Sequence, residues 1–420
     1  MKRIGTLALI LCACFVPAAW AQSQVARPHL SRHAVHHRAL NVSPKSAEKV
    51  SNSGIAAQAA PACKTKLWDL GTFPGGTWAE AGGINDFGAL VAQGDTGPDG
   101  DNHLFTVRFF GPNGPQWSDL GSVGANEGWF FWPEIADTGM IVGYAATDDG
   151  YVHALAWTKK SGRVDLGTLS DLGYNFSVAE RVNKLGTLIV GWSGDTADDS
   201  GVSLPVVWTP TLIKKPDGMT TTWKIQALDT TGFEGFPHWM ATGVNDFGQV
   251  SGIAWDDSDP ENDVSVIWNP LPNGKGWKIM RLPVSPDYPN AEAGGINDRG
   301  ELVGDVDSSD WNTFSAALWK PVDRLRKVYK LTLLPSLPGS TNGGFGESIN
   351  EWGDIVGAAY DADWNMLATR WSTKDRRFVR PLGFPGDWSL ADGVNNQRIA
   401  VGTYGGAQCA NECVAAVQFR

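Results

Sequence analysis

Short apolar runs alternate with polar turns along most of the chain, and one kind of turn recurs seven times. Each copy places a four-residue segment, Asn-Asp-x-Gly in its best form, between two runs rich in Ile, Val, Leu and Ala. Asn or Asp favours the start of a tight turn and Gly takes its left-handed position, so each copy predicts a β-hairpin. The segments are residues 85–88, 136–139, 183–186, 245–248, 297–300, 350–353 and 395–398.

Two more strands are predicted after each hairpin. A third apolar run ends on an aromatic residue, and a fourth carries a Leu in most copies. Four antiparallel strands repeated roughly every 45 to 62 residues are typical of a β-propeller blade rather than of a helical solenoid. The aromatic residues are Phe109, Trp157, Trp208, Trp268, Trp319, Trp371 and Phe419, and the leucines are Leu120, Leu166, Leu228, Leu282, Leu333 and Leu382.

The two ends of the repeat region fit a closed ring. The last copy stops at Phe419 without a fourth strand, whereas an extra strand over residues 66–70 precedes the first copy. If this strand completes the last blade, no sheet edge is left open at the junction. We therefore predict one all-β domain over residues 63–420, a seven-bladed β-propeller of four-stranded antiparallel blades. Arg398 replaces Gly in the last hairpin, which predicts strain or a different turn there.

The repeat also carries a recognisable consensus. A D-L-G-T element precedes an A-x-x-I-N-D-x-G-x-I-V-G core and an x-A-x-x-W segment, with good copies at residues 69–72, 83–88 and 165–168. Over about residues 66–420 this pattern resembles the HAF-type repeat of bacterial extracellular proteins. The His-Ala-Phe signature of that family survives only in part, at residues 103–105 and 153–155. The resemblance implies secretion and repetition. Because the family has no established activity, it carries over no catalytic residue.

The amino-acid composition agrees with an all-β fold and reduces the number of plausible functions. The chain has 50 Gly in 420 residues and a formal net charge of −11. That much Gly weighs against a mainly helical protein, and the acidic balance weighs against a nucleic-acid partner. With 42% hydrophobic residues, most of the chain is able to form a core.

The first 62 residues precede the predicted propeller. Lys2 and Arg3, the apolar run 4–16 and the Ala19-Trp20-Ala21 segment predict a secretory signal peptide over residues 1–21, with lipoprotein anchoring at Cys14 as the alternative. Residues 22–62 are predicted to be a flexible linker with an excess of Lys and Arg. No other apolar run is long enough to span a membrane. We expect a secreted monomer, periplasmic or extracellular.

Three cysteines follow the predicted signal peptide. Cys409 and Cys413 are four residues apart in a Gly-rich loop and are candidates for a local disulfide in an oxidising compartment, which would leave Cys63 unpaired. Free thiols are the alternative.

One set of loops is expected to present aromatic residues around the start of the inner strands. Flat rings at a wet site suit stacking on sugars or contact with a protein partner, and a purely structural role in closing the blade ends is the alternative. The candidate binding residues are Trp78, Trp129, Phe176, His238, Trp239, Phe345 and Trp388.

The loops between second and third strands are acidic. The densest is a candidate Ca²⁺ site with Asp256, Asp257, Asp259, Glu261 and Asp263, although it does not match a complete Ca²⁺ loop and a solvated acidic loop is the alternative. No other cofactor is predicted.

Acidic residues also lie in or near the inner strands, at Glu80, Glu134, Glu180, Glu292, Glu347 and Asp392. They leave open an enzyme that acts on a polysaccharide or a phosphoester. The favoured hypothesis is a non-catalytic module that binds glycan or protein partners through one loop face, and a structural surface protein is the third alternative.

Overall fold

The computed structural model describes residues 65–97, 100, 102–109, 114–122, 130–148, 150–195, 201–215, 218–256, 263–272, 274–323, 328–375, 377–406 and 409–419. The chain divides into units Met1–Ala47 and Glu48–Arg420, and all described residues belong to the second. The predicted signal peptide, the linker, Cys14 and Cys63 therefore lie outside the described residues. Within the described residues, no helix has the length and apolar character needed to cross a membrane.

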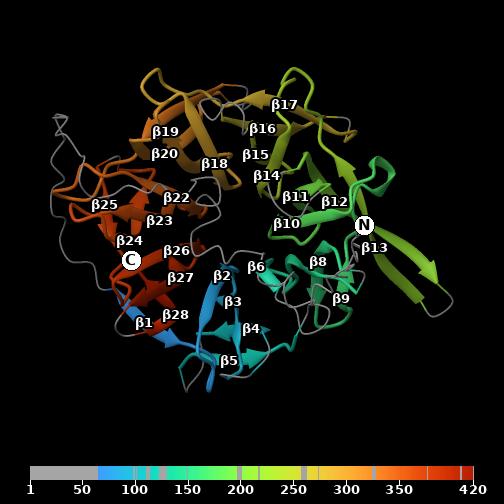
Figure 1. The fold of residues 1–420 in the computed structure, drawn as a ribbon, viewed down its shortest axis with the longest axis horizontal. Helices are drawn as coiled ribbons and strands as arrows, with labels where there is room; N and C mark the ends of the chain where they lie inside the picture. The colour runs from blue at the N-terminus through green and yellow to red at the C-terminus, as the bar shows by residue number, and fades with distance from the viewer. Residues whose placement is uncertain are drawn as a thin grey trace, which may run out of the picture. The chain divides into compact units, whose positions relative to one another are not determined.

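Seven four-stranded antiparallel sheets form a ring, with the first strand of each sheet nearest the ring axis (Figure 1). The predicted all-β propeller of seven blades is thus confirmed. Blades 1 to 3 are β2–β5 (Ala79–Ile84, Ala89–Asp95, Asn102–Arg108, Gln116–Asp119), β6–β9 (Phe130–Ile135, Ile141–Ala146, Val152–Thr158, Gly162–Asp165) and β10–β13 (Phe176–Val182, Ile189–Gly194, Ser203–Lys215, Gly218–Ala227). A short 3-10 helix, η2 (Ser170–Leu172), precedes β10.

Blades 4 to 7 repeat the same order, and the last is completed from the start of the described chain. They are β14–β17 (His238–Val244, Val250–Trp255, Val264–Pro270, Trp277–Arg281), β18–β21 (Asn290–Ile296, Leu302–Asp307, Phe314–Pro321, Tyr329–Leu333), β22–β25 (Gly344–Ile349, Asp354–Tyr360, Met366–Ser372, Val379–Pro381) and β26–β28 (Trp388–Val394, Ile399–Gly406, Cys409–Gln418) with β1 (Lys66–Gly71). Strand β1 pairs with β28, with Lys66 opposite Gln418, as the ends of the repeat region predicted.

The recurring Ile-Val-Gly sequence has a packing cause. Every inner strand shifts register against the second strand of its blade, for example between Ala179 and Arg181. At this bulge the two backbones approach closely. A Cβ on Gly191 would lie 1.9 Å from the Val178 carbonyl oxygen, and a Cβ on Gly304 would lie equally close to that of Glu292. Only Gly fits there.

The aromatic residue that ends the third strand is a core residue. Trp208, Trp268, Trp319 and Trp371 are among the largest fully buried side chains. The indole N–H of Trp268, Trp319 and Trp371 donates to a backbone carbonyl in the loop that leads into the same blade. The bond from Trp268 to Asp229, for example, is 2.7 Å long. Each indole therefore contributes apolar area to the blade packing and also fixes a loop.

The seven hairpins are joined to one another at one end of the ring. In five of the seven hairpins, the side-chain amide of the first residue donates to the first carbonyl of the next hairpin at 2.9–3.2 Å, and the last donor, Asn395, returns to Asn85. In the same five, the backbone N–H of the second residue donates to the side chain of its counterpart in the next hairpin, as from Asp246 to Asp298 at 2.9 Å. Blades 2 and 3 are joined instead through the N–H of Asp137 to the Lys184 carbonyl at 3.0 Å, and blades 3 and 4 through the N–H of Leu185 to Asp246 at 3.2 Å. We call this end, with the turns between third and fourth strands, the hairpin face.

Lys184 occupies the second hairpin position in blade 3. Its Nζ lies 3.1 Å from Asp86 Oδ2 in blade 1 and 3.4 Å from Glu351 Oε1 in blade 6. Burial opposes the charged form of Lys184, but the two carboxylates outweigh this effect, so the pKa of Lys184 is raised. One cation thus joins hairpins from blades that are not adjacent.

The last hairpin shows the strain that its sequence predicts. Arg398 stands where the other copies have Gly and adopts φ 59°, in the left-handed region. Its Nε lies 3.2 Å from Asp354 Oδ2, and Asp354 also pairs with Arg370. The ion pair supports a backbone conformation that is unfavourable for a side chain with a Cβ.

Candidate functional site

Two neighbouring blades carry the same exposed motif at the end of the ring opposite the hairpin face. We call this end the loop face. The loop between β19 and β20 contains Asp310-Trp311-Asn312, and the loop between β23 and β24 contains Asp363-Trp364-Asn365. Trp311 has φ 56° and Trp364 has φ 65°. A left-handed conformation is a genuine outlier for a bulky residue, so each loop must hold its Trp in place with other interactions.

Carboxylates supply those interactions. Asp310 accepts hydrogen bonds from Ser308 Oγ at 2.6 Å and from the backbone N–H and Nδ2 of Asn312 at 3.1 and 2.8 Å. These bonds lower the pKa of Asp310 to about 2. Asp361 accepts from the backbone N–H and Nδ2 of Asn365, both at 2.9 Å, and its pKa is lowered for the same reason. Both loops are therefore closed by carboxylates that stay ionised at neutral pH.

Trp364 extends an aromatic cluster that crosses blades 5 to 7. The rings of Phe314 and Tyr360 are 5.7 Å apart in a T-shaped arrangement, and those of Tyr360 and Trp364 are 5.8 Å apart. Trp388 of blade 7 packs with Tyr360 against the same small core. We call Phe314, Tyr360, Trp364 and Trp388 the aromatic platform. Trp364 is its most open member, with 44% of its surface exposed.

The predicted aromatic residues are placed in several environments. Trp388 belongs to the platform, whereas Trp129 lies outside the described residues. His238, Trp239 and Phe345 are buried in the packing of the blades and offer no open ring surface. His238 stacks on Trp255 with ring centroids 5.2 Å apart.

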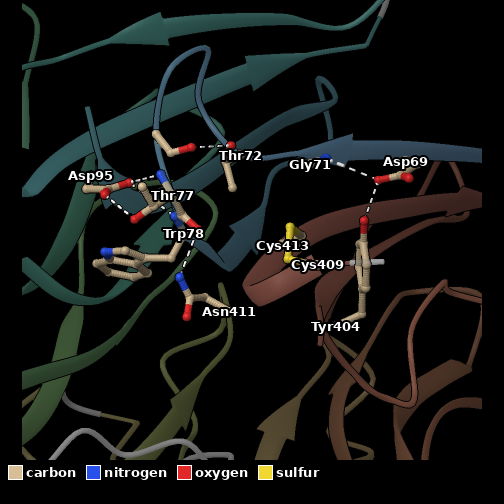
Figure 2. Close-up of a disulfide and its surroundings, with 11 residues drawn as sticks. Asp69, Gly71, Thr72, Thr77, Trp78, Asp95, Tyr404, Cys409, Asn411 and Cys413 are labelled. Carbon is tan, nitrogen blue, oxygen red and sulfur yellow. Dashed lines mark hydrogen bonds between the residues drawn. A yellow bond between two sulfur atoms is a disulfide. The ribbon is translucent and has the colours of Figure 1, made fainter. Parts of the chain in front are cut away.

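Trp78 and Phe176 are partly buried and lie in other blades. Phe176 meets Tyr151 edge-on at 5.4 Å. Figure 2 shows Trp78 in the surroundings of the Cys409–Cys413 disulfide, where blade 7 meets blade 1, with its ring directed away from the two cysteines. Asp95 accepts hydrogen bonds from the backbone N–H groups of Thr77 and Trp78 at 2.6 and 3.1 Å.

The same junction is held from blade 7. Asn411 Nδ2, which lies between the two cysteines in sequence, donates to the Thr77 carbonyl at 3.2 Å. On the other side of the disulfide in Figure 2, the Tyr404 hydroxyl donates to Asp69 at 2.7 Å. Burial and Asp69 together raise the pKa of Tyr404, so this hydroxyl stays protonated. These contacts give the junction a role in closing the ring.

The predicted Ca²⁺ site is described only in part. Asp257, Asp259 and Glu261 lie outside the described residues. Asp263 is buried, and its backbone N–H donates to Asn290 Oδ1 at 3.2 Å. Among the residues that the structure describes, no group of three or more His, Cys, Asp or Glu is arranged to hold a metal ion. Ca²⁺ binding stays a prediction.

The inner-strand carboxylates divide into two groups. Glu180, Glu292 and Glu347 are buried. Glu80, Glu134 and Asp392 are half-buried, and Glu134 is 2.8 Å from Arg181 Nη1 in an ion pair.

Charge is distributed unequally between the two faces. The fourteen loops that end at the loop face contain 21 Asp and Glu but no Lys or Arg. An anionic ligand approaching this face meets only repulsive charges, so a neutral or cationic ligand is favoured. Phosphoester substrates fit this face poorly.

Several platform residues escaped the sequence analysis. Phe314, Tyr360 and Trp364 were not singled out, and neither was Trp311 of the second Asp-Trp-Asn loop, because these loops and the strand ends beside them read as ordinary acidic loops. The available signal is the Asp-Trp-Asn motif at residues 310–312 and 363–365, which repeats at equivalent positions of adjacent blades.

No protein-family profile matches this chain, and no curated protein matches it in sequence. The HAF-type resemblance therefore stays a prediction. Among solved structures, the chain is similar to Trypanosoma rangeli sialidase in complex with 2,3-difluorosialic acid (11% identity, TM-score 0.43, 87% of this chain and 59% of that chain). It is also similar to prolyl oligopeptidase B from Galerina marginata (9%, TM-score 0.49, 78% and 47%) and to a mutant of AofleA from Arthrobotrys oligospora (8%, TM-score 0.37, 78% and 92%). The chain spans about half the length of the sialidase and peptidase chains. At these identities the likeness concerns the fold alone.

Proposed function

We propose that the protein is an exported recognition module that binds a neutral glycan chain on the loop face of blades 5 to 7. The observation that carries the proposal is the pair of Asp-Trp-Asn loops. Each of two adjacent blades holds a Trp in an unfavourable backbone conformation, and Trp364 remains 44% exposed. Strain of this kind persists where surrounding contacts enforce it, and it is concentrated at binding sites.

The chemistry of the platform suits a sugar. An exposed indole offers a flat apolar surface for the C–H face of a pyranose ring, at low cost in side-chain entropy. The exposed Asp363 is next to Trp364 in sequence, and a carboxylate accepts hydrogen bonds from sugar hydroxyls. The absence of Lys and Arg from the loop-face loops disfavours uronates, sialates and sulfated sugars. A neutral glycan chain offers an apolar face to the indole and hydroxyl groups to Asp363, and it carries no negative charge that the acidic face would repel.

The two alternatives have less support. An enzyme acting on the loop face needs an acid or base that reaches the substrate. Glu180, Glu292 and Glu347 are buried, which leaves Glu80, Glu134 and Asp392 as the half-buried inner-strand candidates. A left-handed Trp does not by itself require a binding role, since Trp132 in β6 has φ 49°, but a structural role does not account for the exposure of Trp364. We therefore favour binding without catalysis.

The proposal is tested on a glycan array with the purified full chain, followed by calorimetric titration of the best neutral oligosaccharide. Trp364→Ala is expected to weaken binding at least tenfold. Trp352→Ala is the matched control, because Trp352 is an equally exposed indole in the same blade at the hairpin face. The proposal is overturned if only anionic glycans bind, if no glycan binds, or if both variants bind as the unmodified chain does.

A further inference from the structure

Large apolar side chains are exposed together on the hairpin face. The third residue of the hairpin is Phe87 in blade 1, Leu185 in blade 3, Phe247 in blade 4 and Trp352 in blade 6. These side chains are 73%, 55%, 63% and 51% exposed, respectively. The same position is occupied by Thr138, Arg299 and Gln397 in the other three blades. Large apolar side chains exposed at one structural position of four blades indicate an interaction surface.

The hydrogen-bond ring fixes these side chains relative to one another. The N–H groups of Phe87, Phe247 and Trp352 each donate to the Asn Oδ1 of their own hairpin, at 3.0–3.1 Å. That Asn also bonds the next hairpin through Nδ2. The apolar set is therefore a rigid feature of the ring, and we call it the apolar crown.

Basic residues lie farther from the axis at the same face. The turns between third and fourth strands of blades 2, 4 and 6 present Lys159, Lys160, Lys275 and Lys374, all exposed. Lys374 Nζ lies 5.9 Å from the centre of the Trp352 ring, so basic and apolar groups adjoin there. The loop face has no Lys or Arg in its loops. The hairpin face thus carries both signs, with the hairpin carboxylates Asp86, Asp246 and Glu351 nearer the axis and lysines farther out, whereas the loop-face loops carry acidic residues without Lys or Arg.

Blade 3 adds a projecting arm to this face. Strands β12 and β13 have 13 and 10 residues, whereas the corresponding β16 and β17 of blade 4 have 7 and 5. Beyond Trp208, where pairing with β11 ends, residues 209–215 pair only with residues 218–224 and stand clear of the ring (Figure 1). Leu212 and Ile213 are 67% and 43% exposed there, next to the exposed Lys214.

We propose that the hairpin face docks onto an anionic lipid bilayer, with the loop face directed away from it. Exposed apolar side chains that enter the interface and lysines that meet anionic headgroups are the two contributions on which peripheral membrane binding depends. The apolar crown and the arm, residues 209–215 with 218–224, supply the apolar side chains. The lysines of the turns between third and fourth strands supply the positive charge at the same face. The loop-face loops have no Lys or Arg to offset their acidic residues, so an anionic surface repels that face more strongly and favours contact through the hairpin face.

Other occupants fit less well. A second copy presenting the same face would bring two rims of lysines together. A nucleic acid would leave the crown and the arm without contacts, since sequence-independent binding relies on charge. An anionic bilayer satisfies the apolar and the basic groups together.

The test is sedimentation of the full chain with vesicles of phosphatidylcholine alone or with phosphatidylglycerol added. Binding is expected only to the anionic vesicles and is expected to fall at high salt. The double variant Leu212→Asp/Ile213→Asp is expected to reduce it at least tenfold. Leu172→Asp, a comparably exposed leucine on the loop face at 58%, is the matched control and is expected to bind as the unmodified chain does.

Four results would overturn the inference. They are equal binding to both vesicle types, no binding to either, an equal loss in the arm and control variants, and tighter binding to duplex DNA than to vesicles. Circular dichroism of the arm variant separates loss of binding from loss of fold. None of these results bears on glycan binding, which uses the other face.

Discussion

Trp352 and Trp364 lie at the two ends of one strand, β23, and each leaves about half of its surface exposed at a different face of the ring. Trp352 belongs to the hairpin before the strand, where its Nε1 donates to the Asn396 carbonyl at 2.9 Å. Trp364 belongs to the left-handed loop after it. One blade thus offers the same side chain to both proposed partners, which allows the two faces to be tested against each other.

The first prediction is a reciprocal loss. Trp364→Ala is expected to reduce glycan affinity at least tenfold and to leave vesicle binding unchanged. Trp352→Ala is expected to reduce vesicle binding and to leave glycan affinity unchanged. Both side chains are exposed, so each substitution should change the free energy of unfolding by only about 1 kcal/mol. Parallel titration and vesicle sedimentation check this, and a variant that impairs both activities would contradict the assignment of faces.

The second prediction separates the backbone of Trp364 from its side chain. At φ 65° a residue with a Cβ is strained, whereas Gly is not. Trp364→Gly is therefore expected to be more stable than Trp364→Ala by about 1 kcal/mol in the free energy of unfolding, measured by chemical denaturation. Both variants should lose glycan binding.

Trp352 supplies the control for this comparison, because it is not among the residues with positive φ. There the order should reverse, with Trp352→Gly less stable than Trp352→Ala. If the two sites gave the same order, backbone strain at Trp364 would not be the cause.

The sequence predicted the fold in detail because each blade repeats the same local requirements. The hairpin needs Asn and Gly, the bulge needs the Gly of Ile-Val-Gly, and the third strand needs a large aromatic residue such as Trp268. Because these requirements recur in seven copies, the sequence was compatible with one architecture, a seven-bladed β-propeller. They also predicted strain at Arg398, which has a left-handed backbone.

The site was harder to predict, for two physical reasons. Neighbouring residues of a strand face opposite sides of the sheet, so a place near the start of an inner strand does not decide exposure, and the candidates include the buried Trp239 as well as the half-buried Trp388. The exposure of Trp364 depends on a left-handed backbone held by Asp361, and neither composition nor periodicity encodes that conformation. The Cys409–Cys413 disulfide was a candidate in the sequence because the two residues are only four apart, with free thiols as the alternative.

The third prediction concerns that disulfide. Cross-linking residues four apart removes little chain entropy from the unfolded state, so reduction is expected to lower the free energy of unfolding by about 2 kcal/mol. Thermal unfolding with and without a reductant measures the effect. The double variant Cys409→Ser/Cys413→Ser should have the stability of the reduced protein and should not respond to the reductant. A response of the double variant would assign the effect to another group.

The fourth prediction concerns Lys184 and the carboxylates of the hairpin ring. Burial raises the pKa of Asp137 and Asp246, and neighbouring carboxylates raise both further, whereas Lys184 lowers both. Lys184→Met is therefore expected to lower the melting temperature at about pH 8, because repulsion among ionised carboxylates is no longer offset. Removing the cation should also raise the pKa values of Asp137 and Asp246 further.

The pH dependence distinguishes this electrostatic role from a packing role. A carboxyl whose pKa is higher in the folded than in the unfolded state binds extra protons on folding, so it favours the folded state as pH falls through its folded pKa. The deficit of Lys184→Met should therefore be largest near about pH 8 and shrink as pH falls through the raised folded pKa values of Asp137 and Asp246. The raised pKa of Lys184 means that its stabilisation is present below the unfolded value of about 10.4 and is lost at higher pH, so the deficit should also shrink above that value. Lys160→Met, an exposed lysine in a turn of blade 2, should change the melting temperature little at any pH. A deficit that stays constant while both these carboxyls and Lys184 titrate would show that Lys184 contributes through packing alone.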